Sequence, residues 1–424
     1  MLDLKLIRNE TEFVREALHR RGAHAEAALD KLLEMDRARR ELLVAVEEKR
    51  ASRNAASEEI AKAKRAKEDA TAQIEAMRLV GDEIKALDAQ LKDIEAQLEE
   101  ELLQVPNLPE PSAPTGGEED SLVMHHVGVP RAFAFPPKDH LDLALPYDMI
   151  DMERGARTSG SRFAYLKGDL VFLQFALVQF ALQKLASKGF RPVVVPVLVR
   201  DEAMFGTGFF PTDMQQVYRV EEDGLNLVGT SEVPLAALHM DEILDEADLP
   251  VRYVGYSSCF RREAGAAGKD TRGIFRVHQF DKVEMFSFCA PDRSGEEHDF
   301  MRGIEEEVLQ ELGLPYRAVN IAAGDLGASA AKKYDCEVWL PTQERYREVT
   351  SCSNCTDYQA RRLRVRAKGD KGGPYLLHTL NGTVVAVGRT IIAIMENYQT
   401  EEGLVEVPAV LRPFLPPGKE LLGA

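Results

Sequence analysis

Apolar residues recur at helical spacing through the first quarter of the chain, which predicts long helices there. Residues 25–64 are rich in alanine, glutamate and arginine and contain neither glycine nor proline, a composition typical of uninterrupted helix. The apolar residues of a second stretch alternate in steps of three and four, at Met77, Val80, Ile84, Leu87, Leu91, Ile94 and Leu98. Because only a polar tip at residues 66–71 separates the two stretches, they are expected to pack as an antiparallel coiled coil.

The ends of this helical region carry different patterns. Leu2, Leu4 and Leu6 alternate with polar residues and predict a short strand, followed by a helix through residues 13–18. After the second long helix come closely spaced residues that cannot continue a helix, namely Pro106, Pro109, Pro111, Pro114, Gly116 and Gly117. The predicted organisation is an N-terminal domain at 1–104, a linker at 105–120 and a larger region at 121–424.

The larger region mixes helices with strands and predicts an α+β fold. Residues 169–188 form a helix that is apolar nearly all round, as expected for packing on a sheet and on a second subunit, or within a monomer. Further on, residues 257–284 predict two antiparallel strands joined by a loop with three glycines. In the second strand, predicted over 274–285, Phe280, Lys282 and Glu284 alternate and therefore share one face.

Composition limits the partners and the compartment. The chain has 70 acidic and 53 basic residues and a net charge of −17, so any RNA-binding site should be a local basic patch. The first arm helix carries such a strip, although its cations could instead pair with the acidic return helix. Five cysteines without secreted spacing suggest a reducing compartment. Without an apolar N-terminal core, and with residues 170–185 interrupted by glutamines, the expectation is a cytoplasmic protein with no membrane association.

Candidate chemistry is concentrated around the predicted hairpin. Its first strand ends in Phe260, Arg261, Arg262 and Glu263, and a cationic loop with Lys269 and Arg272 follows. Arginine binds phosphate oxygens through its planar fork, aromatic rings and guanidinium groups stack on bases, and glutamate binds an amine or orients an arginine. This combination suits a nucleotide, and the alternative is a surface hairpin with ordinary salt bridges.

Five motifs resemble the seryl-tRNA synthetases of the class II aminoacyl-tRNA synthetase family. The Phe-Arg-x-Glu hairpin resembles motif 2, and the helix at 169–188 with Pro196 resembles motif 1, which forms the dimer interface. Residues 378–392 resemble motif 3, although Val384 stands where the general class II pattern has glycine. Residues 227–234 resemble the seryl Thr-x-Glu element, and residues 348–355 resemble its Glu-x-x-Ser-Cys-Ser-Asn-Cys run. With no second Cys-x-x-Cys or nearby histidine pair, zinc at Cys352 and Cys355 is disfavoured.

The resemblance implies a homodimer with a class II antiparallel sheet flanked by helices and an N-terminal helical arm. It implies the activity of a serine–tRNA ligase, with L-serine, ATP, Mg²⁺ and tRNA(Ser) as partners, and the selenocysteine tRNA as a further acceptor where one exists. Two other functions remain open. One is a relative that loads a carrier protein, which would not need the basic arm; the other is a catalytically silent RNA-binding homologue.

The resemblance also implies roles for particular residues. The serine-binding residues are Thr230, Ser231, Glu232, Arg261, Glu284 and Thr383. The ATP-binding residues are Arg261, Arg262, Glu263, Val277, Phe280, Glu348, Val349, Thr350, Ser351 and Arg389, of which Arg261 and Arg389 are catalytic and Glu348 and Ser351 hold Mg²⁺. The tRNA-binding residues are Arg37, Arg40, Lys49, Arg50, Arg53, Lys62, Lys64, Arg65, Lys269 and Arg272.

Overall fold

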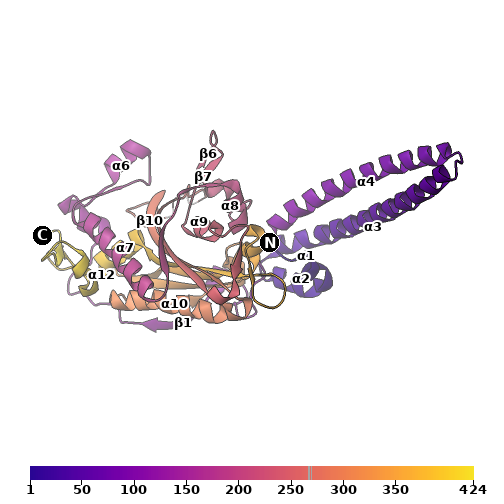
Figure 1. The fold of residues 1–424 in the computed structure, drawn as a ribbon. Coiled ribbons are helices and arrows are strands. Elements are labelled where there is room, and N and C mark those ends of the chain that lie inside the picture. The colour runs from indigo at the N-terminus through magenta and orange to yellow at the C-terminus, as the bar shows by residue number, and fades with distance from the viewer. Residues whose placement is uncertain (266–267, 269) are drawn as a thin grey trace. The chain divides into compact units, whose positions relative to one another are not determined.

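A computed structural model describes residues 1–265, 268 and 270–424 (Figure 1). Of the predicted site residues, only Lys269 lies outside the described residues. The chain forms two compact units. One comprises residues 2–106, and the other comprises Met1 and residues 107–424.

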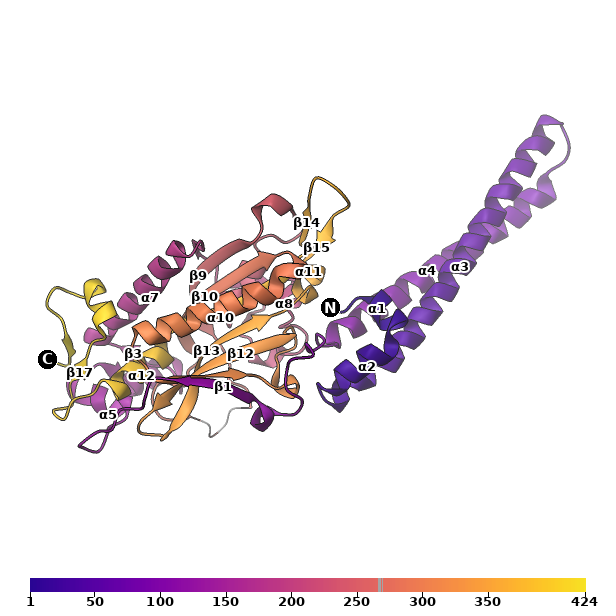
Figure 2. The same cartoon turned by 90° about the horizontal axis from the view of Figure 1, so that it is seen from below.

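The first unit is entirely helical in its regular structure. Its helices are α1 (Leu4–Asn9), α2 (Thr11–His19), α3 (Ala23–Arg65) and α4 (Thr71–Gln104). The long helices α3 and α4 lie side by side in both views (Figures 1 and 2), with Val46, Ile60, Ile84 and Leu98 buried. The antiparallel helical arm is therefore confirmed.

The prediction of a strand at Leu2, Leu4 and Leu6 is wrong, because Leu4 and Leu6 lie in the first turn of helix α1. The side chain of Asp3 accepts a hydrogen bond from the backbone N–H of Lys5 at 2.7 Å and so caps the helix. Such a cap satisfies a backbone donor that the first turn of a helix leaves unpaired. The alternating leucines fit a strand only in isolation, and the cap favours the helix.

An eight-stranded sheet forms the centre of the second unit. Its order is β1-β11-β12-β13-β16-β10-β9-β4, and every neighbouring pair is antiparallel except β4 and β9. The strands are β1 (Leu122–Val127), β4 (Arg191–Val194), β9 (Val251–Phe260), β10 (Gln279–Cys289), β11 (Tyr316–Asn320), β12 (Lys332–Leu340), β13 (Arg345–Asn354) and β16 (His378–Ala386). An antiparallel sheet of this kind can leave one face open for a ligand.

Helices and short strands surround this sheet. The helices are α5 (His140–Ala144), α6 (Met152–Ser159), α7 (Asp169–Ser187), α8 (Asp201–Thr207), α9 (Glu232–Ala237), α10 (Ser294–Glu311), α11 (Tyr358–Leu363) and α12 (Val387–Asn397). The short strands are β2 (Ile150–Asp151), β3 (Tyr165–Leu166), β5 (Leu198–Arg200), β6 (Arg219–Val220), β7 (Leu225–Leu227), β8 (Ile243–Asp245), β14 (Arg366–Lys368), β15 (Tyr375–Leu376), β17 (Val405–Glu406) and β18 (Leu421–Leu422). Figure 1 shows α10 below the sheet and α8 and α9 above it.

Helix α7 has the composition that the sequence suggested. Among the described residues it is the one helix long and apolar enough to cross a membrane, a property that core helices of soluble proteins share. Its residues Leu173, Leu177 and Phe180 are buried in the main apolar core, whereas Phe172 and Phe175 are 50% and 55% exposed. One side of α7 therefore packs on its own domain and the other side presents phenylalanine to the surface.

The predicted hairpin is present, but its second strand begins at Gln279 rather than at Ile274. Strands β9 and β10 pair in antiparallel fashion, with Phe280 opposite Cys259. The backbone N–H of Ile274 donates to Nε2 of His140 at 3.2 Å instead of joining a strand ladder. A histidine from α5 thus satisfies the backbone where a strand was expected.

Two β-bulges set the direction of side chains on the open face of the sheet. On β13, Glu348 pairs with Glu337 and Thr350 with Cys336, so that Val349 is the additional residue. On β16, Thr383 pairs with Glu284 and Val385 with Val283, so that Val384 is the additional residue. A bulge shifts the alternation of side chains by one position, and residues beyond it change face.

Candidate active site

Most of the predicted serine- and ATP-binding residues meet over strands β9, β10, β13 and β16. Two cavities of 440 and 120 Å³ lie there, and Arg261, Glu263 and Arg276 line both. The smaller one is also lined by Phe275, Val277, Phe280, Lys282, Glu348, Val349, Ser351, Thr383, Ala386, Gly388 and Arg389. Residues that are far apart in the sequence therefore form one polar site rich in arginine.

Hydroxyl, carboxylate and ammonium groups gather at the buried end of this site. The Nζ atom of Lys282 lies 2.5 Å from Oε2 of Glu284 and donates to Oγ1 of Thr230 at 2.7 Å. The hydroxyl of Thr383 donates to the same oxygen of Glu284 at 3.4 Å. Glu284 is only 1% exposed. The net charge at this end of the site therefore depends on the pairing of this buried carboxylate with Lys282.

Glu232 is a second buried carboxyl group beside Glu284. Its Oε1 accepts hydrogen bonds from Gln359 at 2.7 Å and from Asn381 at 3.0 Å. Burial, and then the charge of Glu284, raise the pKa of Glu232 to about 7. Near neutral pH this group is poised between its two protonation states, and an ammonium group nearby would favour the ionised form.

Arginines dominate the other end of the site. The guanidinium of Arg261 lies over the ring of Phe280, 5.2 Å from its centroid, and its Nε donates to the carbonyl of Gly229 at 3.1 Å. Arg276 donates to Glu263 at 2.7 Å. These groups present positive charge and an aromatic face together, which suits a nucleotide.

Glu348 and Ser351 both line the smaller cavity although they are three residues apart on one strand. The bulge at Val349 makes this possible, since residues three apart on a regular strand point to opposite faces. The side chain of Glu348 is 43% exposed, and its partial burial acts against ionisation, but Arg389 and Lys333 outweigh this effect and lower its pKa to about 2. Arg389 Nη1 lies 3.2 Å from Oε2 of Glu348. An ionised carboxylate beside a hydroxyl is a donor set that fits Mg²⁺.

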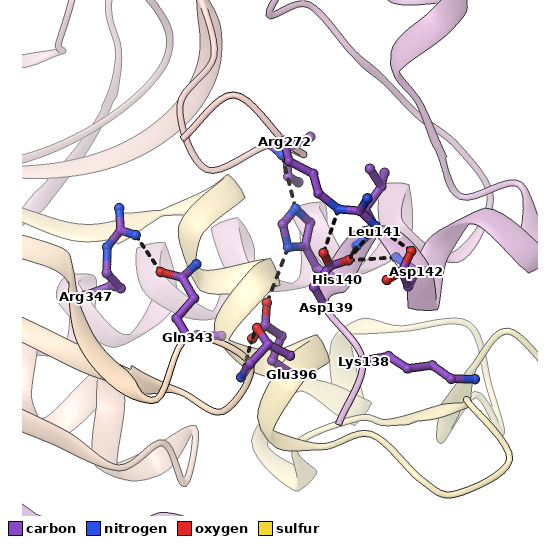
Figure 3. A network of polar contacts seen from close by, with 12 residues as sticks. Lys138, Asp139, His140, Leu141, Asp142, Arg272, Gln343, Arg347 and Glu396 are labelled. Atoms are coloured by element: carbon purple, nitrogen blue, oxygen red, sulfur yellow. Dashed lines mark hydrogen bonds and ion pairs between the residues drawn. The ribbon is translucent and has the colours of Figure 1, made fainter. Parts of the chain in front are cut away.

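The polar network in Figure 3 holds the segment that leads into β10. Arg272 donates to Asp139 at 2.7 Å and also pairs with Asp142. Next to it, the Nδ1 atom of His140 lies 3.4 Å from Oε1 of Glu396 on α12. Arg272, predicted to bind tRNA, is therefore already paired with two carboxylates, and a tRNA phosphate would have to compete with them.

Some predicted residues do not direct their side chains into the cavities. Ser231 shares a hydrogen bond of 3.0 Å with Ser257, and Thr350 donates to Glu305 on α10 at 2.9 Å. Arg262 is exposed and lines neither cavity. Val384 is 1% exposed in the apolar core, so its side chain does not fill the site.

Arg276 and Lys282 line the site but were given no role from the sequence. Lys282 belongs to the alternation of Phe280, Lys282 and Glu284 along β10, whereas Arg276 lies before that strand begins at Gln279. That alternation could have indicated Lys282 but not Arg276. Asn381 and Gln359, which bind Glu232, carried no comparable signal.

The arm cations divide into paired and unpaired groups. Lys49 pairs with Glu83 at 2.6 Å and Arg50 with Asp88 at 3.0 Å, both across to α4. Arg37, Arg40 and Lys62 pair with carboxylates on α3 itself. Arg53, Lys64 and Arg65 are exposed and form no ion pair with any residue that the structure describes. The unpaired cations lie toward the tip, at the end of α3.

Two family matches and one close relative decide what this chain is. Residues 1–109 match the seryl-tRNA synthetase N-terminal domain, and residues 216–398 match the tRNA synthetase class II core domain (G, H, P, S and T). A serine–tRNA ligase from Acidothermus cellulolyticus is 49% identical over 415 residues, which span 98% of this chain and 98% of that protein. The chain belongs to the seryl-tRNA synthetase family. Its members are ligases that form aminoacyl-tRNA, and the predicted family is confirmed.

Two solved structures of seryl-tRNA synthetases share this fold. The crystal structure of seryl-tRNA synthetase from Pyrococcus horikoshii complexed with ATP has a TM-score of 0.94 at 41% identity and covers 98% of each chain. The cytoplasmic serine–tRNA ligase from Naegleria fowleri in complex with AMP has a TM-score of 0.90 at 34% identity and covers 99% of this chain and 98% of that one. The predicted fold, with its class II sheet and helical arm, is confirmed.

Proposed function

We propose that this chain activates L-serine with ATP in the cavities over β9, β10, β13 and β16 and then transfers it to tRNA(Ser). The observation that carries this proposal is the buried end of the site, where Glu284 and Thr383 suit a hydroxyl and Glu232 suits an ammonium. The arginines at the other end suit the phosphates of ATP. The ATP and AMP complexes of the two related structures support this arrangement.

The reaction proceeds in two steps. The serine carboxylate attacks the α-phosphate of ATP in line, which gives seryl-adenylate and pyrophosphate, and a ribose hydroxyl of the terminal adenosine of the tRNA then attacks the acyl carbon. Negative charge develops on phosphate oxygens in the first step, so alignment and fixed positive charge are the main catalytic factors. Arg261 bridges the α-phosphate and the serine carboxylate, and Arg389 holds the γ-phosphate.

The remaining nucleotide contacts are proposed from the family resemblance. Phe280 stacks on adenine, which requires the guanidinium of Arg261 to move from its place over the ring. Glu263 meets the adenine edge through its carboxylate, and Val277 lines the same cavity. Glu348 and Ser351 would hold Mg²⁺, which supplies charge neutralisation for the phosphates.

Amino-acid-dependent pyrophosphate exchange with ATP and Mg²⁺, measured across all twenty amino acids, tests this function. We expect serine alone to support strong exchange. Alanine does not supply the hydroxyl that Glu284 and Thr383 would bind, and this loss costs several kcal/mol by the general behaviour of sites built for a hydroxyl. Threonine is excluded by its additional methyl group, a weaker discrimination. Absence of exchange with serine would contradict the assignment.

The protonation of Glu232 should appear in the serine KM. Below the raised pKa of about 7 this carboxyl is protonated and lacks the charge that the serine ammonium requires. The serine KM in pyrophosphate exchange should therefore fall by about tenfold as the pH rises from about 6 to about 8. The ATP KM should change little over this range, and Glu232→Gln should remove the dependence. A serine KM that rises with pH would contradict the role of Glu232.

The arm is proposed to bind the tRNA backbone through its basic strip. We expect Arg53→Glu, Lys64→Glu and Arg65→Glu together to raise the tRNA KM by at least about tenfold at moderate salt, because three phosphate contacts become repulsive. Pyrophosphate exchange should be unchanged. The matched control is Arg78→Glu with Lys85→Glu, which reverses two exposed cations that pair with carboxylates on α4 itself and were given no role in tRNA binding. Unaltered aminoacylation by the triple variant would exclude these residues from the tRNA interface.

Further properties follow from the same family. The exposed Phe172 and Phe175 on α7 support a homodimer, since the motif 1 helix is the expected interface. The selenocysteine tRNA is proposed as an additional acceptor where the organism has one. The proposed location is the cytoplasm, in keeping with five cysteines that are all free and buried.

A further inference from the structure

Lys282 lies at the centre of the serine end of the site, and the sequence motifs of the family leave it without a role. Its side chain is 8% exposed and bridges two elements, because Nζ contacts Glu284 on its own strand and Thr230 just before α9. A lysine is seldom buried to this degree without a specific partner. Its contacts are with two residues proposed to select serine.

The charged groups of bound serine would not compensate the negative charge of Glu284. A zwitterionic serine would place its ammonium against Glu232 and its carboxylate against Arg261. Glu284 would receive only the neutral hydroxyl. Since a buried carboxylate is costly without a partner of opposite charge, Glu284 needs Lys282 to remain beside it when serine is bound.

The hydrogen bonds around Glu284 show where that hydroxyl fits. The Oε2 atom of Glu284 forms the ion pair with Lys282 and accepts the hydrogen bond from Thr383. Oε1 accepts no hydrogen bond from any residue in the described part of the chain, so it is the oxygen left for the substrate. The hydroxyl oxygen of Thr230, in turn, accepts both from Lys282 and from the backbone N–H of Glu232 at 3.1 Å, which uses both of its lone pairs.

We propose that Lys282 is a positioning residue for serine selection. It remains paired with Glu284, holds that carboxylate in position and leaves one of its oxygens to the substrate hydroxyl. When the serine ammonium arrives, Lys282 gives up its hydrogen bond to Thr230, whose hydroxyl oxygen then accepts from the substrate. This role rests on the proposed function of the site as the place where serine is activated.

Lys282→Met tests the proposal in pyrophosphate exchange. We expect the serine KM to rise by about 10- to 100-fold, and the preference for serine over alanine to fall by a similar factor, the range for losing a hydrogen-bonded charge. The ATP KM should stay within about twofold of the wild-type value. Lys282→Arg keeps the cation and should restore much of the preference. If the methionine variant does not fold, Lys282→Gln, which keeps donors but no charge, gives the same expected loss.

A double-mutant cycle with Glu284→Gln separates action through Glu284 from an independent effect. In the Glu284→Gln background, Lys282→Met should change the serine KM by less than about twofold, because the charge that Lys282 stabilises is already absent. An equal loss in both backgrounds would show that Lys282 acts elsewhere. Arg252→Met is the matched control, since it breaks the pair of Arg252 with the buried Glu297 away from the cavities.

The outcomes distinguish this role from the function on which it rests. If the wild-type enzyme shows no serine-dependent exchange, the proposed function fails and the role of Lys282 fails with it. If the wild type is active and Lys282→Met keeps its serine KM and its preference over alanine, only the role of Lys282 is overturned.

Discussion

Replacing Arg261 with alanine is expected to lower kcat for serine-dependent pyrophosphate exchange by about 10³- to 10⁵-fold, the range for an arginine that stabilises a phosphoryl transition state. In the proposed mechanism this guanidinium contacts both reacting groups, the serine carboxylate and the α-phosphate. Its removal therefore affects alignment as well as charge. Arg261→Lys should recover little of the activity, because an ammonium cannot span two oxygens in the bidentate manner of a guanidinium.

Arg293→Ala provides the matched control for this substitution. Arg293 is exposed at the start of α10 and pairs only with Glu296 among the described residues. Its loss should leave both kcat and KM unchanged. The Arg261→Ala variant should still bind ATP, with reduced affinity, when binding is measured by titration calorimetry. Wild-type kcat in that variant would exclude Arg261 from the reaction.

Replacing Glu284 with alanine is expected to lower kcat/KM for serine by at least about 1,000-fold. The variant loses the acceptor for the serine hydroxyl and also leaves Lys282 as a buried cation without its partner. The effect should fall mainly on serine, with the ATP KM little altered. Exchange with alanine should not decrease in proportion, because alanine makes no hydroxyl contact.

Glu297→Ala is the control for the loss of a buried, cation-paired glutamate. Glu297 is 6% exposed and accepts from Arg252 and Ser287 away from the cavities. This substitution should reduce thermal stability yet leave the serine KM unchanged. If Glu284→Ala retained wild-type exchange with serine, the assignment of the serine site would be wrong.

Local patterns predicted the parts of the site that depend on one continuous segment. Phe280, Lys282 and Glu284 share a face because alternation along a strand is a property of the backbone itself. The boundary of that strand was less well predicted. Residues 274–278 have strand-like composition, but His140 takes the hydrogen bond of Ile274 and the ladder begins only at Gln279.

The bulges at Val349 and Val384 could not be read from the sequence. Their residues are ordinary strand formers, and a bulge depends on how two strands pair rather than on either strand alone. The bulge on β13 nevertheless decides that Glu348 and Ser351 face the same cavity. It also directs Thr350 toward α10, where it meets Glu305.

The sequence by itself determined the helical arm, the antiparallel hairpin and the family, because periodicity and motif order are local properties of the chain. Only the tertiary structure decided the electrostatic state of the site. The pairing of Lys282 with Glu284, the raised pKa of Glu232 and the lowered pKa of Glu348 all arise from groups brought together from distant segments. Burial and charge act over a few ångströms in space, and those distances do not exist until the chain has folded.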